Sequence, residues 1–430
     1  MSPTPAGQRD HETRTRTLLV QLGTAMVATG ETVDEVEEEI ALVSAHLGYP
    51  DPQIAAAPTG ITLNLSSGGV ASYQSSPGSL RLDQVVDVRR ILHHLMNDSL
   101  DPDRALVELV ELRSKPPRYS KLLFWVGAVG VAVGIALILQ PGLPNLALSA
   151  VAAVVVTAMA QWSRRSQLLT TLLPTVAALA VAVMVFAAAD AGLIEGPLRT
   201  LLPPLAVMLP GALLVTGMSE LAAGHMVAGS SRLTYGLVQL LLLSLGVVTA
   251  AQVLRVDSSA LANVRVDQLG WWAAPLGLVL VSVCVCLLES TSLRLLPWIL
   301  AVLLLAFGAQ TLGQLVGGAP LGSFLGAICA SLGAALAETI RPRLPRLVIF
   351  MPAFWLLVPG SLGLLSVTQL AIDPGESTTT GFDVVLVVSA IALGLLVGSA
   401  VARSMRGLLR RLRWGRTAPP ATPAAGALSP

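Results

Sequence analysis

Two proline-glycine segments are the residues in this sequence best suited to binding a small polar molecule. LPGAL at 209–213 returns as VPGSL at 358–362, so that Pro210 corresponds to Pro359, and each copy lies within a long apolar run. Proline removes a backbone donor and glycine loosens a helix, so the two helices predicted by these runs should be broken there. Interrupted spans at matching places in two halves of a membrane protein are typical of a transporter's substrate site.

The chemistry expected at such a break is anion binding. A helix that starts again after a break presents free N–H groups at the positive end of its dipole. We expect the N–H groups near Gly211 and Gly360 to hold the carboxylate of an amino acid, and the Ser361 hydroxyl to add a hydrogen bond. The alternative is a kink that serves packing alone, because glycine and proline are common in membrane helices.

Three ionisable side chains in or beside the apolar runs are candidates for carrying protons. An acid at the centre of a bilayer costs about 2.5–3.5 kcal/mol, so it tends to face a cavity or a partner. Glu220 is therefore the first predicted proton-coupling carboxylate, with an ion pair to Arg232 as the alternative. His225 titrates near physiological pH, but its place at the end of a run also suits an ordinary interfacial histidine. Glu338 is a coupling candidate too, with an interfacial ion pair to Arg341 as its alternative.

Other polar residues in the runs also allow two interpretations. Gln310 and Gln314 are four residues apart and share one helix face, so they line a polar path for substrate or make a helix–helix contact. Glu289 lies close to Arg294 and is expected to form an interfacial ion pair or to take part in coupling. We include Gln310 among the predicted substrate-binding residues.

Positioning these residues requires many membrane-spanning helices. Of the 430 residues, 53% are hydrophobic and only 12% are charged, whereas soluble proteins carry about 25% charged residues. After residue 117 the sequence holds ten apolar runs near the roughly 20 residues that cross the hydrocarbon. They are 122–139, 143–161, 168–189, 201–219, 233–254, 270–288, 295–316, 321–338, 347–370 and 382–402. In the first run, Gly127, Gly130 and Gly134 have the spacing of close helix packing.

The first part of the chain predicts a different structure. Residues 15–117 are too polar to enter a bilayer and predict an α+β domain. Helices are expected at 15–29, 33–47, 81–97 and 102–113, and strands at 60–65 and 70–74. Residues 1–14 and the basic, then Pro/Ala-rich tail at 406–430 are predicted to be disordered.

Loop charges predict the orientation of the helices. Loops on one side carry most of the basic residues, including Arg164, Arg165 and Arg294, whereas the opposite loops are rich in acids. The positive-inside rule therefore places both termini in the cytoplasm. Two halves of five spans each, 118–256 and 257–405, enter the membrane in opposite senses, so the Pro-Gly echo predicts a 5+5 inverted repeat. The predicted fold class is mainly α: a polytopic membrane protein of ten transmembrane helices with an N-terminal cytoplasmic α+β domain.

The sequence lacks the motifs that are typical of several other classes of protein. There is no P-loop, nucleophile elbow or zinc-ligand spacing, so ATP-driven pumping and metal chemistry are not indicated, and no cofactor is expected. The three cysteines lie in apolar runs, which argues against a disulfide framework. A net charge of +1 gives no indication of nucleic-acid binding.

The order of several short motifs resembles that of the threonine/serine exporter (ThrE-type) family. The motifs are GETVDEVE at 30–37, PTGI at 58–61, SKPPRY at 114–119, LPG at 209–211, GMSEL at 217–221, GSSRL at 229–233, MPA at 351–353 and LVPGS at 357–361. The similarity covers roughly residues 15–405. It implies an inner-membrane carrier with a cytoplasmic domain and ten helices, which exports threonine and serine using the proton motive force. At Glu220 the family more often has aspartate, which puts substrate specificity in question.

Composition and spacing alone predict a secondary transporter. The resemblance adds the expectation that it exports small hydroxy-amino acids in exchange for protons, with the paired Pro-Gly breaks as the site. Its expected partners are threonine or serine, protons and the lipid bilayer; a homo-oligomer stays open. One alternative is a membrane-anchored enzyme whose cytoplasmic domain is a hydrolase, and another is a membrane scaffold or sensor that transports nothing.

Overall fold

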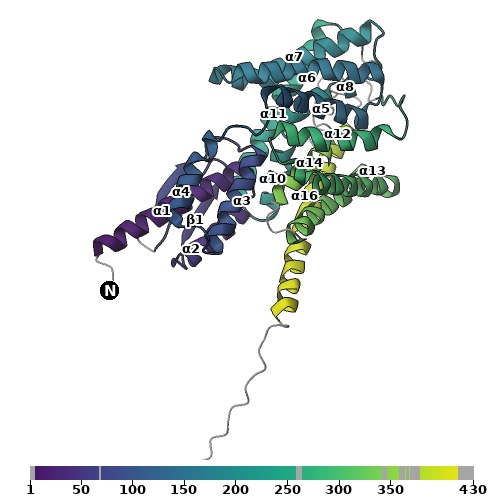
Figure 1. The fold of residues 1–430 in the computed structure, drawn as a ribbon. Coiled ribbons are helices and arrows are strands. Elements are labelled where there is room, and N and C mark those ends of the chain that lie inside the picture. Colours follow the sequence, from purple (N-terminus) through teal and green to yellow (C-terminus); the bar gives the residue numbers. More distant parts are fainter. Residues whose placement is uncertain are drawn as a thin grey trace, which may run out of the picture.

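The computed structural model describes residues 5–66, 69–257, 264–340, 346–357, 364, 368 and 378–414, and these are mainly helical. In Figure 1 the purple and blue N-terminal elements lie together beside the longer helices drawn from teal to yellow. We call residues 5–114 the N-terminal part.

The N-terminal part packs helices against one small sheet. The helices are α1 (Pro5–Thr29), α2 (Val33–His46), α3 (Leu82–Met96) and α4 (Pro102–Glu111), followed by the 3₁₀ turn η1 (Leu112–Ser114). Strands β1 (Gln53–Ala57), β2 (Gly60–Asn64) and β3 (Ser72–Ser75) form an antiparallel sheet in that order. Helix α1 lies directly on β2, because a Cβ placed on Gly23 would come within 2.5 Å of Ile61 Cδ1.

The helices of this part begin and end close to the predicted positions, with two differences. Helix α1 begins at Pro5, so the residues from there to 14 are helical rather than disordered as predicted. An ion pair between Asp10 and Arg14, four residues apart, favours this extra length. Strand β1 was not predicted, because its sequence QIAAA has neither alternation nor a run of β-branched residues.

The rest of the described chain is a set of apolar helices. They are α5 (Lys121–Leu139), α6 (Leu143–Ser163), α7 (Gln167–Asp190), α8 (Pro197–Thr200), α9 (Leu202–Leu205), η2 (Ala206–Met208), α10 (Gly211–Ala222), α11 (Met226–Val253), α12 (Ala273–Leu288), η4 (Leu293–Leu295), α13 (Leu296–Ile340), α14 (Arg346–Leu357) and α16 (Thr378–Trp414). Among the described residues, six helices are long and apolar enough to cross a membrane, or seven if the bent pair ending in α10 is one span.

Helix α13 is a hairpin of two arms. A straight helix of its 45 residues would measure about 67 Å, far more than the roughly 30 Å of a hydrocarbon core. The backbone leaves helical geometry at Gly317 and Gly318, where φ is 75° at the second glycine. A Cβ on Gly313 would come within 2.7 Å of the Cα of Gly322, so the chain folds back on itself.

The predicted close packing at the glycines of the first span is confirmed. Gly127, Gly130 and Gly134 all face α12, and a Cβ on Gly134 would lie 3.0 Å from the carbonyl oxygen of Gly277. Helices α5 and α12 therefore lie with their backbones almost in contact.

The last predicted spans are described in part. Helix α14 covers the start of the run at 347–370, and most of the remainder lies outside the described residues. Helix α16 continues to Trp414, so the start of the tail that was predicted to be disordered is helical.

Candidate functional site

The predicted break in the first half is present in the structure. The helical stretch Pro197–Met208 and helix α10 meet at an angle of 68°. Leu209 is extended, Pro210 is turned, and α10 begins at Gly211. Pro210 and Gly211 are buried, and the first N–H groups of a helix have no partner within it. A buried helix start is therefore available at this break.

The corresponding Pro-Gly segment of the second half, with Pro359, Gly360 and Ser361, lies outside the described residues. Gln310 is half-buried, and its backbone oxygen lies against Gly322 on the other arm of α13, together with the Cγ atom of Gln314. This geometry fits the helix–helix contact that was the alternative for these glutamines.

Glu220 lies in a buried ion pair at the end of α10. Its Oε2 atom is 3.1 Å from Nε of Arg232, and both side chains are more than nine-tenths buried. The two groups meet at ion-pair distance without the alignment of a hydrogen bond. Oε1 accepts the backbone N–H of Val33 at 3.1 Å, and Arg232 donates to the backbone oxygen of Glu31 at 3.1 Å. This pair therefore joins the apolar helices to the N-terminal part.

The bond from Val33 caps helix α2. Thr32 is its N-cap residue and makes no side-chain cap bond, so the carboxylate of Glu220 takes the place of the usual cap. A negative group at this end also opposes the positive end of the helix dipole. The same arrangement recurs at α3, where the N–H of Leu82 donates to Oε2 of Glu289 at 3.3 Å.

A second group of charges lies directly behind this contact. Arg89 on α3 donates to Glu31 at 2.6 Å and to both carboxylate oxygens of Glu39. Burial raises the pKa of Glu31 to about 8, because the loss of hydration outweighs the attraction of Arg89, and the charges of Glu39 and Glu35 add to the rise. Burial alone would lower the pKa of Arg89, but the carboxylates around it raise it above its ordinary value. Glu31 is thus poised to hold a proton near neutral pH.

The second half of the chain reaches the same region. Arg346 at the start of α14 lies 3.4 Å from Glu35 and donates to the hydroxyl of Ser331 on α13 at 2.9 Å. The charge of Glu338, at the end of α13, acts on Arg89. We call Glu31, Glu35, Glu39, Arg89, Glu220, Arg232, Glu338 and Arg346 the junction cluster.

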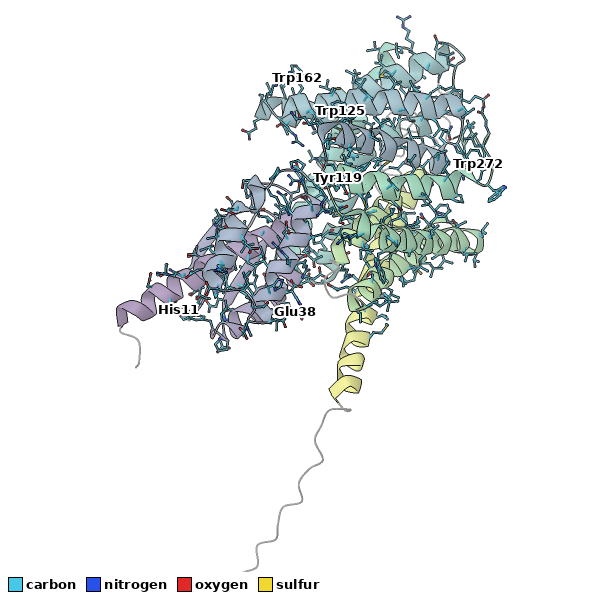
Figure 2. All side chains as sticks on the ribbon, viewed as in Figure 1. His11, Glu38, Tyr119, Trp125, Trp162 and Trp272 are labelled. Atoms are coloured by element: carbon cyan, nitrogen blue, oxygen red, sulfur yellow. The ribbon has the colours of Figure 1, made fainter. Side chains whose placement is uncertain are left out.

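The predicted coupling residues thus gather at the N-terminal part. His225 is the N-cap residue of α11, and its N–H bonds to the backbone oxygen of Glu220 at 2.8 Å. Tyr119, which Figure 2 labels where the two parts meet, donates to the backbone oxygen of Thr291 at 2.9 Å. The sequence showed the carboxylates as candidates but gave no indication that they would contact α2 and α3.

The sequence did not lead us to predict a network of neutral hydrogen bonds around Gln140. Gln140 is fully buried at the end of α5; its amide donates to the backbone oxygens of Glu195, Gly196 and Val264 and accepts from the N–H of Val266. Nearby, Asn145 donates to the Glu195 oxygen and the Thr200 hydroxyl, each at 2.8 Å. We call this network the amide clamp. An amide directly before a Pro-Gly turn was the available signal.

The repeated apolar helices define a multi-pass membrane protein. A family model described as "Putative threonine/serine exporter" matches residues 17–254, more than half of the chain, and the chain belongs to this family. It is also 25% identical over 342 residues to a Mycobacterium tuberculosis protein named "Probable threonine/serine exporter", covering 75% of this chain and 63% of that relative. The chain thus spans less than two thirds of the relative's length. No solved structure matches the chain.

These descriptions name an exporter and not a hydrolase. The alternative of a membrane-anchored hydrolase therefore has no support from the comparisons, and membership of an exporter family favours a transporter.

Proposed function

We propose that this protein is a secondary active exporter of threonine and serine, and that it exchanges the amino acid for protons. The observation that carries the proposal is the buried helix break at Pro210 and Gly211 in a protein of the exporter family. The start of α10 offers N–H groups and a positive dipole end to the substrate carboxylate. Pro359, Gly360 and Ser361 would supply the corresponding groups from the second half.

Ten spans remain our proposal for the membrane part. The two arms of α13 account for two spans, the bent pair ending in α10 for one, and α12, with 16 residues, for one more. Trp162 and Trp272, at opposite ends of the helix layer in Figure 2, suit the two membrane interfaces. Arg164 and Arg165 follow Trp162, so we place that side, the N-terminal part and both termini in the cytoplasm, with the carrier in the inner membrane.

The proposed inverted repeat is supported by a pair of matching contacts. A Cβ on Gly246 of α11 would meet the backbone of α7 at residues 175 and 179 and the Cβ of residue 178. A Cβ on Gly394 of α16 would meet the backbone of α13 at residues 324 and 328 and the Cβ of residue 327. The three residues of α13 each lie 149 positions after their counterparts in α7 (175 to 324, 178 to 327, 179 to 328), as Pro359 does after Pro210, and Gly394 lies 148 positions after Gly246. The third and fifth spans of each half thus pack alike.

The fourth span of each half also packs against the opposite half. Helix α10 contacts α16 as well as α11, and Val215 packs in a cluster that holds Val302 and Ile391 of the second half together with residues of α5 and the N-terminal part. Leu364, which is 149 residues later, packs in the other cluster with first-half residues such as Val181 and Leu243. A carrier that works by rocking its halves around a central site needs the interrupted spans at the boundary between them.

We propose Glu220 as the proton-coupling carboxylate, with His225 and Glu338 as further groups in the proton path. In the described conformation Glu220 is paired with Arg232, so coupling by Glu220 requires that this pair opens during the cycle. Uptake into vesicles with and without an imposed pH gradient tests this. Equal dependence on the gradient in wild type and Glu220→Gln would remove Glu220 from the coupling role.

Counterflow of labelled threonine in proteoliposomes tests the transport function. Wild-type protein should exchange external label for internal unlabelled threonine or serine, and Gly211→Val should abolish this exchange by placing a side chain at the start of α10. Gly308→Val is the matched control, because a Cβ at Gly308 of α13 would meet no atom of the described residues within 4 Å. A wild-type protein without solute-dependent exchange would contradict the proposal.

A further inference from the structure

We propose that the hydroxyls of Ser219 and Thr368 are a matched pair of substrate contacts, one on the inner passage and one on the outer passage to the central site. The proposal deepens the proposed transport function and rests on it. Ser219 lies nine residues after Pro210, and Thr368 lies nine residues after Pro359, so the two hydroxyls occupy corresponding places in the two halves.

Both hydroxyls are buried and have no hydrogen-bond partner in the part of the chain that the structure describes. Ser219 is 6% exposed and Thr368 is 1% exposed, and neither side-chain oxygen makes a hydrogen bond among the described residues. Many other hydroxyls in these helices instead donate to the carbonyl oxygen four residues before them, as Ser282 does to Leu278 and Thr249 to Leu245. The hydroxyls of Ser149, Ser244 and Thr291 are also buried without a hydrogen bond among the described residues, but only Ser219 and Thr368 occupy corresponding places in the two halves. A buried polar group left unpaired suits a role that requires a partner from outside the chain.

Both residues lie close in sequence to a residue that packs with the opposite half. Gly217 packs against Gly229 of α11, so Ser219, two residues later, lies on the other side of α10. It follows Val215, which packs with the second half, by one turn. Thr368 lies four residues after Leu364 in the sequence, and Leu364 packs with the first half. In an inverted repeat one hydroxyl then lies toward the cytoplasm and the other toward the outside.

The test is a transport measurement made separately from each side of oriented vesicles. Ser219→Ala should raise the half-saturating concentration of threonine by about fivefold to tenfold from the cytoplasmic side only, as expected for one lost hydrogen bond. Thr368→Val should do so from the outer side only, whereas Ser219→Thr should keep the wild-type value. Ser282→Ala and Thr249→Val are the controls.

The outcomes separate this proposal from the transport function. If wild-type protein shows no exchange, the function itself is wrong. If wild-type protein exchanges threonine but both variants leave the two half-saturating concentrations unchanged, or shift them equally on both sides, the matched contacts are wrong and the exporter stands.

Residues 30–35 contact both halves of the membrane part, through Glu220 and Arg232 on one side and Arg346 on the other. We propose that this segment, which we call the strap, ties the halves together in the described conformation and releases the second half in each transport cycle. The strap detaches at Arg346, because that ion pair is partly exposed, whereas its attachments to Glu220 and Arg232 are buried. Glu220 and Arg232 both belong to the first half, so their ion pair can open for proton coupling without release of the strap from that half.

Cross-linking tests the strap. In a variant with Cys284, Cys286 and Cys329 replaced by serine, Glu35→Cys with Arg346→Cys should stop exchange when joined by a cleavable thiol cross-linker, and reduction should restore it. Arg90→Cys with Glu108→Cys is the matched control, because it joins α3 to α4 within the N-terminal part, where the native pair is 3.0 Å apart. If threonine exchange continues after residues 35 and 346 have been fully cross-linked, the proposed release of the strap is wrong.

A labelling measurement covers the case in which the double variant is inactive before cross-linking. A single Glu35→Cys should react faster with an impermeant thiol reagent when threonine is supplied, whereas Val33→Cys, buried beside Glu220, should not. Equal rates with and without threonine at position 35, or a larger rise at position 33, would overturn the proposed release. Absence of exchange in wild type would instead contradict the transport function.

Discussion

The junction cluster and the amide clamp lie at opposite ends of the helix layer and hold it in different ways. The amide clamp is neutral, and Gln140 uses both its amide nitrogen and its oxygen. The junction cluster is charged, and Glu31 Oε2 and Glu220 Oε2 are buried without a hydrogen bond. The clamp joins three loops, whereas the cluster joins separate parts of the chain.

The difference indicates which end is built to change. Neutral hydrogen bonds between backbone and amides hold one geometry and respond little to pH or ions. Buried charges with incomplete hydrogen bonding are strongly destabilising once a partner leaves, and they change when a proton binds. We therefore interpret the clamp as a fixed point and the junction cluster as the end where the halves separate.

The largest effect is expected at the buried ion pair. Arg232→Met should lower the free energy of unfolding by about 3–5 kcal/mol, because it leaves the carboxylate of Glu220 buried without its cation. Chemical unfolding in detergent measures this. Adding Glu220→Gln to Arg232→Met should restore a large part of the loss. A double variant as unstable as the single one would show that the charge of Glu220 is not the cause.

The amide clamp should give a smaller loss. Gln140→Leu leaves the N–H of Val266 without its acceptor and removes one donor from three backbone oxygens, which should lower stability by about 1–3 kcal/mol. The loss is limited because the oxygens of Glu195 and Gly196 keep bonds from Asn145 and Thr200. The loss should be independent of salt and pH, unlike that at Arg232. Gln167→Leu at the exposed start of α7 is the matched control and should have little effect. A salt-dependent loss at Gln140 would contradict the contrast between the two regions.

The pH dependence should arise at the junction cluster. The pKa of Glu31 is about 8 in the folded chain against an ordinary 4.5. The folded state therefore binds the proton of Glu31 more tightly than the unfolded state does. The contribution of this proton to the free energy of unfolding is fully present below pH 4.5 and is lost as the pH rises toward 8. The slope contributed by one such group is at most about 1.4 kcal/mol per pH unit. Glu31→Gln should flatten the unfolding profile across this window; an unchanged slope would assign it to another group.

The sequence predicted the elements well because local signals determine them. Proline and glycine were enough to predict the break at Pro210, and the gap between the apolar runs 295–316 and 321–338 predicted the turn between the arms of α13. Asp101 and Pro102 likewise predicted the start of α4, where Asp101 accepts the N–H of Asp103. Each of these signals acts within a few residues of its effect.

The contacts of the candidate site could not be predicted in the same way. Glu220 and Val33 are 187 residues apart, and no local pattern shows that a carboxylate on a span will cap a helix of the N-terminal part. The ion pair with Arg232 was weighed because the two residues are near in sequence. Arg89, which joins Glu31 and Glu39, was not considered, because it lies on an ordinary amphipathic helix.

The smallest effect should be at the exposed end of the strap. The side chains of Glu35 and Arg346 are 32% and 21% exposed and 3.4 Å apart, so Glu35→Gln should cost less than about 1 kcal/mol, and salt should weaken even that. Thermal unfolding at low and high salt measures it. Transport should respond more than stability, because the weak attachment is the one that we expect to open and close in each cycle. A stability loss at Glu35 as large as that at Arg232 would show that the strap is fixed equally to both halves, and the junction cluster would then be a static joint like the amide clamp.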